Sequence, residues 1–176
     1  TLPSELQKSG SAGKIALAKP RGEHWLAFSE YDFSTANFFI DDLGFYSQAR
    51  EHGGALQCIY KDDHASSPIR RYQLSFQPNC RWNWDGVNTV RELELAPSIS
   101  FMNFWFLGLS YVHMFPAYDD ANRGIVGLYR RPPGNKLTAT VQTDARQPLV
   151  TTASGGYESS SKYLQTIFSS LQCTIK

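Results

Sequence analysis

The chain has 176 residues, of which 41% are hydrophobic, 19% charged and 14% aromatic, and its formal net charge is +1. This length suits one domain with a sizeable core, and the neutral balance removes the electrostatic basis for general nucleic-acid binding. Because aromatic side chains favour pleated surfaces, the composition indicates strands. We therefore expect a flexible, Gly/Ser-rich lead-in at residues 1–13 and a single β-rich domain at residues 14–176.

Apolar or alternating segments separated by turn formers predict the strands of the first half. Asp41-Asp42 could cap a short helix that runs through Arg50, since carboxylates satisfy the free amides at a helix start. The alternation is cleanest in the segment that ends at Phe76. The expected strands are 14–18, 24–33, 56–61 and 69–76, and the last two form a predicted hairpin around the turn at 62–68.

The second half begins with an alternating strand, Thr89 to Leu95, which Pro97 separates from an aromatic run. That run, residues 101–115, is too short to span a bilayer, and we expect it to form a buried strand pair. Residues 124–130 and 136–143 then predict another hairpin around a Pro-Pro-Gly-Asn turn.

The hydrophobic spacing changes near the C-terminus, in residues 159–172. Apolar residues here recur three and four positions apart, which predicts one helical stripe with serines at its start. The sequence thus predicts an α+β, mainly β, fold of about eight mostly antiparallel strands with a C-terminal helix packed on the sheet. The stripe consists of Tyr163, Leu164, Ile167, Phe168 and Leu171.

Three widely spaced cysteines, Cys58, Cys80 and Cys173, form no Cys-x-x-Cys pair, which argues against zinc knuckles and thioredoxin chemistry. They allow three single-bridge pairings, and the candidate disulfide is Cys58–Cys80. Together with the missing initiator Met, this favours an exported protein, periplasmic or secreted. A lipid-modified cysteine before Thr1 would account for the odd count. No transmembrane segment is expected, and the absence of an Asn-x-Ser/Thr sequon fits a bacterial envelope.

The sequence contains no motif for catalysis or for a cofactor. Gly-x-Ser-x-Gly and phosphate-binding glycine loops are missing, and the four histidines do not form local metal pairs. The acidic doublets at 41–42, 62–63 and 119–120 lie beside turn formers, so turn and capping roles are favoured over calcium binding or glycoside chemistry. We expect no cofactor, no metal and no enzyme activity. A hydrolase whose site gathers from distant segments, with His64 or His113, remains an alternative.

Residues 81–86, Arg-Trp-Asn-Trp-Asp-Gly, are the most unusual local feature. The candidate partner-binding residues are Arg81, Trp82, Trp84 and Asp85, because two tryptophans spaced by two share a face and exposed aromatics anchor partners. The competing interpretation is that the tryptophans close the end of a β-sandwich core. Residues 84–91 are loosely similar to the end of a βγ-crystallin repeat, but a second copy with matching spacing is missing.

Two functional hypotheses follow. The first is an exported non-enzymatic binding protein that occludes a protein partner, as an inhibitor does. A helix after a β-rich body is similar to small exported lipoproteins, including immunity proteins that neutralise secreted bacterial toxins. The second is a β-barrel-like binder of a small apolar ligand, whose pocket would be lined by aromatic residues. The candidate lining is Phe101, Phe104, Trp105, Phe106 and Tyr111.

Overall fold

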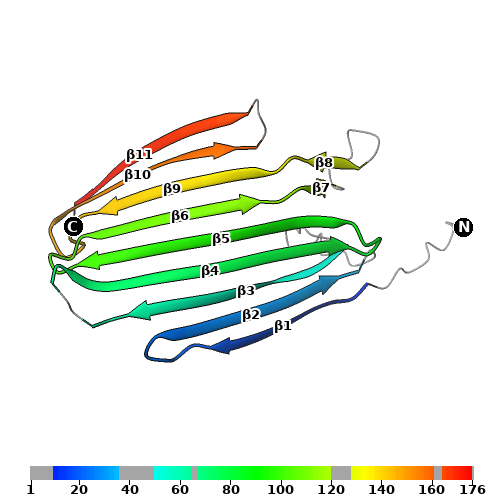
Figure 1. The fold of residues 1–176 in the computed structure, drawn as a ribbon, viewed down its shortest axis with the longest axis horizontal. Coiled ribbons are helices and arrows are strands. Elements are labelled where there is room, and N and C mark those ends of the chain that lie inside the picture. The colour runs from blue at the N-terminus through cyan, green and yellow to red at the C-terminus, as the bar shows by residue number, and fades with distance from the viewer. Residues whose placement is uncertain (1–9, 36–49, 65–66, 120–127, 161–163, 176) are drawn as a thin grey trace, which may run out of the picture.

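The computed structural model describes residues 10–35, 50–64, 67–119, 128–160 and 164–175, and every regular element in these ranges is a strand (Figure 1). Nine strands form one antiparallel sheet, and two short strands form a second. In order across the large sheet the strands are β1 (Ala12–Lys19), β2 (Trp25–Ser34), β3 (Glu51–Asp62), β4 (Ile69–Asn83), β5 (Asn88–Phe101), β6 (Phe106–Met114), β9 (Gly134–Gln142), β10 (Leu149–Ser159) and β11 (Gln165–Ile175). The small sheet pairs β7 (Ala117–Asp119) with β8 (Tyr129–Arg131).

The large sheet is a meander, in which each strand pairs with the next along the chain except where β7 and β8 intervene between β6 and β9. The predicted β-rich fold is confirmed. The early strands lie where the alternation places them, and β3 and β4 form the predicted hairpin. In Figure 1 the sheet forms one continuous layer, with β1 and β11 at its two edges.

The predicted C-terminal helix is wrong, because residues 165–175 form β11, paired with β10 along its whole length. Ile167 and Leu171 are four residues apart, a spacing that fits one face of a helix and also one face of a strand. The free edge of β10 provides hydrogen-bond partners that the helical pattern does not anticipate. Tyr163, the first residue of the predicted stripe, lies outside the described residues.

Three other expectations differ from the structure. Pro97 does not end a strand but lies inside β5, opposite Leu74. Of the predicted hairpin of 124–130 with 136–143, residues 124–127 lie outside the described residues; the described Tyr129–Arg131 strand, β8, pairs with β7, while β9 pairs with β6 and β10. The aromatic run at 101–115 is a turn followed by β6, and several of its large side chains are exposed. The helix expected from Asp41-Asp42 falls on residues 36–49, outside the described residues.

A hydrophobic core is almost absent from the described part of the chain. The buried hydrophobic residues there are Ile59, Ala117 and Val150, whereas many large apolar side chains are exposed. A single layer of sheet cannot cover its own faces, since burial needs a second layer. The function must therefore be sought on the two faces of this sheet.

Candidate functional site

One face of the large sheet carries exposed large apolar side chains on every strand, with charged residues such as Lys19, Asp62 and Arg91 toward the strand ends. Directly paired residues lie on the same face, so the registers assign each side chain to a face. All the exposed large hydrophobic residues in the nine strands of the large sheet lie on this side, which we call the apolar face. They are Ile15, Leu17, Trp25, Tyr31, Leu56, Tyr72, Leu74, Phe76, Trp82, Leu95, Leu109, Tyr111, Leu137, Val141, Leu149, Tyr157, Ile167, Leu171 and Ile175.

The apolar residues form a band that crosses the strands obliquely. On β1 the band ends at Leu17, before Lys19. Directly paired residues define a row that runs straight across the strands. The row that starts at Leu17 on β1 passes through Leu93 on β5 and reaches β11 at Gln165. On β11, however, the band extends to Ile175, ten residues beyond that row. With about 3.3 Å per residue and about 4.8 Å between strands, this border makes an angle of about 40° with the direction across the strands of the nine-stranded sheet. The opposite border runs from Ile15 to Ile167, whose row reaches β1 at Lys19, and this smaller offset makes an angle of about 20°.

Aromatic residues mark both borders of this band on β2–β4. At one border the rings of Trp25 and Tyr60 pack edge to face at 5.0 Å, and Tyr60 lies 6.0 Å from Tyr72. Tyr72 and Trp82 lie at opposite borders on β4, ten residues apart. Ten residues span about 33 Å along a strand, and about 25 Å once the strand is inclined by about 40°.

The opposite border is an aromatic cluster around His52. Its ring lies 4.8 Å from that of Trp84 and 6.1 Å from that of Trp82, while Tyr31 Oη lies 3.1 Å from His52 Nδ1. Trp84 Nε1 donates a hydrogen bond of 2.7 Å to the Ser34 carbonyl. The Trp84 N–H and the Tyr31 hydroxyl at this border therefore have polar partners while their rings extend the apolar surface.

The other face, which we call the polar face, has ion pairs toward the β4–β5 turn. Arg81 makes two parallel hydrogen bonds, of 2.8 and 2.7 Å, to the carboxylate of Asp32, which lies two strands away. The Arg81 side chain crosses Gly53, where a Cβ atom would lie 2.7 Å from Arg81 Cγ, so this position requires a glycine. A neighbouring pair joins Lys14 to Glu30 at 2.7 Å.

Toward the opposite turns, the polar face consists largely of amides and hydroxyls, and three hollows lie along it. The first, 410 Å³, spans β3–β6 and β9; the second, 280 Å³, adjoins it around Arg71; and the third, 300 Å³, lies over β1–β4. Hydrogen bonds connect neighbouring strands across this region. They include Gln57–Ser75, Thr140–Ser154 and Gln142–Thr152 at 3.1–3.2 Å.

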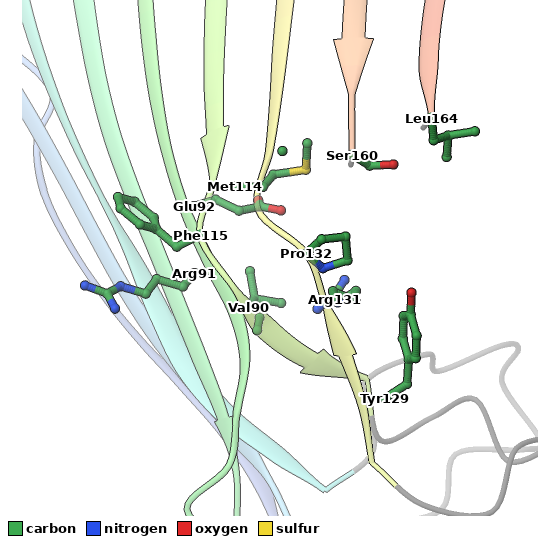
Figure 2. A pocket seen from close by; sticks show the side chains of 12 residues that line it. Val90, Arg91, Glu92, Met114, Phe115, Tyr129, Arg131, Pro132, Ser160 and Leu164 are labelled. Carbon is green, nitrogen blue, oxygen red and sulfur yellow. The ribbon is translucent and has the colours of Figure 1, made fainter. Parts of the chain in front are cut away.

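A fourth hollow of 310 Å³ lies where the small sheet meets the ends of β5, β6 and β9 (Figure 2). Its lining includes the apolar side chains of Met114, Pro132 and Tyr129, together with Leu164, the residue before β11. The guanidinium of Arg131 donates a hydrogen bond to the Thr89 carbonyl, which ties β8 to β5.

The predicted partner-binding residues divide between the two faces. Trp82 and Trp84 contact the same His52 ring, as expected for residues that share a side, and both are exposed. Arg81 lies on the polar face, bonded to Asp32, and Asp85 lies in the β4–β5 turn, where its N–H donates to Asn83 Oδ1. The four residues therefore do not form one surface.

The alternative set of pocket residues is also dispersed. Phe101 ends β5, Phe104 and Trp105 lie in the turn after it, and Phe104 adopts a φ of 63°. Phe106 lies on the polar face, whereas Tyr111 lies on the apolar face. The hollow around Phe106 is lined mainly by polar side chains, a feature that sequence reasoning missed because the hollow depends on strand register.

The three cysteines are free, so the predicted disulfide is absent from the structure. Cys58 pairs with Phe76 and Cys80 with Gly54, which places the two thiols four residues apart along adjacent strands. This offset, about 13 Å, exceeds the reach of a disulfide. Cys58, Cys80 and Cys173 all lie on the apolar face.

Histidines and acidic residues gather at the β3–β4 turn without forming a metal site. His64 Nδ1 donates a hydrogen bond of 2.8 Å to Asp62, which raises the pKa of His64; the backbone N–H and then the ring of His64 lower the pKa of Asp62. A hydrogen bond with Tyr60 is the main cause that raises the pKa of Tyr72 to about 12. Within the described ranges, no three His, Cys, Asp or Glu side chains are placed to hold a metal ion. His113 is bonded to Asn135 at 2.8 Å, far from this turn.

No family model matches the chain, and no curated protein and no solved structure is significantly similar to it. In the part of the chain that the structure describes, no helix is long and apolar enough to cross a membrane.

Proposed function

We propose that this sheet is embedded in a lipid bilayer, with its apolar face against the hydrocarbon chains and its polar face toward water. The observation that supports it best is the oblique apolar band. Strands that cross a membrane are tilted by about 35–45°, and their lipid-facing side chains form a band about 25 Å tall between girdles of aromatic residues. One border of the band has an inclination in this range, the band on β4 has a similar height between Tyr72 and Trp82, and aromatic residues lie at both borders on β2–β4.

The alternation along each strand supports the same arrangement. On β4, Tyr72, Leu74 and Phe76 lie on the apolar face, while Gln73 and Ser75 between them lie on the polar face. In a water-soluble sheet the apolar side would be covered by a second layer. Here Leu109, at the centre of the band on β6, is 42% exposed, and Ile167 on β11 is 84% exposed. Lipid chains would cover this surface without a protein core.

The proposal also requires that both edges of the sheet be paired. Backbone N–H and C=O groups cannot remain without partners in hydrocarbon, and β1 and β11 each pair with one neighbour in the sheet. Both edges must therefore be paired in the membrane, with each other or with strands of another chain. The role we propose is a non-enzymatic module that presents a hollowed polar face to water within the bilayer.

Fluorescence quenching by brominated lipids tests the proposal. The four native tryptophans are replaced by Phe, and a single reporter is introduced as Leu95→Trp on the apolar face or Ser98→Trp on the polar face. In vesicles we expect lipid brominated near the chain ends to quench the Leu95→Trp reporter strongly, because Leu95 pairs with Phe76 and Tyr111 within the band. Aqueous iodide should quench the Ser98→Trp reporter instead.

The reverse pattern, with iodide quenching the Leu95→Trp reporter and brominated lipid leaving it unchanged, would remove the basis of the proposal. Far-UV circular dichroism of each variant checks that the strands persist. The predicted occlusion of a protein partner through Trp82 and Trp84 stays a prediction, and it competes with lipid for the same aromatic surface. A partner that binds the protein in detergent and is lost on Trp82→Ala would favour it.

A further inference from the structure

Two hollows on the polar face meet around one aromatic ring. The larger, 410 Å³, and its neighbour, 280 Å³, share Gln73, Ser98 and Phe106 among their lining residues. Among the described residues, Phe106 is the one aromatic residue that lines either hollow. Together the two hollows form a trough across β3–β6 and β9, near the middle of the sheet.

The position of the Phe106 ring is fixed by a glycine. Gly108 lies two residues further along β6, on the same face. A Cβ atom at position 108 would lie 2.9 Å from Cε1 and 3.1 Å from Cζ of Phe106, closer than carbon atoms normally approach. The ring therefore packs against the bare backbone of Gly108 and lies low on the polar face, where it lines the trough.

Amides and hydroxyls surround this ring, and they retain capacity for further hydrogen bonds. Gln57 Nε2 donates one bond of 3.2 Å to Ser75, and Gln73 Oε1 accepts one of 3.2 Å from Arg71. A side-chain amide offers two donor hydrogens and an acceptor with two lone pairs, so each Gln can still donate and accept. In the part of the chain that the structure describes, Glu94 is the one charged residue that lines the larger hollow, and it already accepts a bond of 2.7 Å from Ser110.

We propose that this trough binds a neutral, polyhydroxylated solute, which we identify by its chemistry as a sugar with more than one ring. Hydroxyl groups both donate and accept, which matches the amides and hydroxyls, and the C–H surface of a sugar ring matches the face of Phe106. A second hollow joined to the first provides room for a second ring. A charged ligand would meet Glu94 in the larger hollow and Arg71 in the smaller one, and both already have partners, since Glu94 accepts from Ser110 and Arg71 pairs with Asp63. The inference rests on the proposed function, because it assumes that the polar face is open to water.

Saturation-transfer NMR with the full chain in detergent tests the inference, using maltotriose and cellotriose as probes and citrate and spermidine as charged comparators. At least one trisaccharide should bind, and Phe106→Ala should weaken its affinity at least tenfold. Phe106→Trp should retain binding, since it keeps a flat ring. The matched control is Phe28→Ala, which removes an aromatic residue from a different hollow of the polar face and should leave the affinity unchanged.

The inference fails if neither trisaccharide binds, if a charged comparator binds as tightly, or if Phe28→Ala and Phe106→Ala have equal effects. Circular dichroism shows whether Phe106→Ala loses sugar binding merely because it misfolds. In that case, the binding measured for Phe106→Trp still tests the role of the ring. Because binding is measured in detergent, a negative result here leaves the lipid-quenching test intact. Loss of lipid quenching with retained sugar binding would instead overturn the membrane proposal alone.

Discussion

Replacement of Leu109 by Arg separates a membrane-embedded sheet from one in water. Leu109 lies at the centre of the apolar band on β6 and is 42% exposed. In water, little more than half of the Leu109 side chain is buried, so its loss should lower the free energy of unfolding by about 1 kcal/mol or slightly more. The methylene groups of Arg would recover part of this apolar contact. At the middle of a bilayer, Arg on the lipid face costs about 2–4 kcal/mol.

The matched control is the adjacent residue, Ser110, which lies on the polar face and bonds to Glu94. Arg at position 110 would be near that carboxylate, so we expect Ser110→Arg to change stability by less than about 0.5 kcal/mol. Urea unfolding from short-chain phosphatidylcholine vesicles, followed by tryptophan fluorescence, measures both variants. A cost of Leu109→Arg below about 2 kcal/mol, or one equal to that of Ser110→Arg, would refute the reasoning.

Three further predictions follow from named contacts. In vesicles, Cys58 on the apolar face should not react with a water-soluble maleimide. A single cysteine introduced as Gln57→Cys on the polar face, in a background without native cysteines, should react readily. Equal reaction rates would contradict the assignment of faces. Asp32→Asn should lower the free energy of unfolding by about 1–3 kcal/mol, because the Arg81 side chain, 11% exposed, loses its charged acceptor. Lys14→Met should cost less than about 0.5 kcal/mol, since the Lys14–Glu30 pair is exposed. Denaturant unfolding measures both variants, and equal costs would contradict a larger contribution from the Arg81–Asp32 contact. The pKa of His64 should lie above its ordinary value of 6.5, so its bond to Asp62 stabilises the turn below that pH and is lost as the pH rises through the raised pKa. An NMR titration of His64 measures this, and a midpoint that is not lower in the Asp62→Asn variant would contradict the assigned cause.

The sequence predicted most strands because alternation of polar and apolar residues is a local property. Tyr72 to Phe76 alternates on either side of β4 as expected, and the hairpin with β3 follows from the turn at 62–68. The same local reasoning failed at residues 165–175, where a spacing of four fits a helix and a strand equally well. The free edge of β10 decided the outcome, and no residue of β11 encodes it alone.

The sequence also suggested that Trp82 and Trp84 share a side, but it could not place Arg81 opposite them on a bond to Asp32, 49 residues earlier in the chain. It predicted that the aromatic run would be buried, since large aromatics usually are. Burial is a property of neighbours, and within the described ranges the tertiary structure supplies no second layer over Leu109 or Tyr111.

By itself, then, the sequence determined that the chain forms strands with one apolar and one polar side, because apolar and polar residues alternate with a period of two within each such segment. Only the tertiary structure decided that nine of these strands join in one sheet, that their apolar sides form an oblique band, and that Phe106 lies in a trough over Gly108. The physical reason is register: the offset between neighbouring strands is set by pairing over the whole sheet, and both the slope of the band and the hollows depend on that offset.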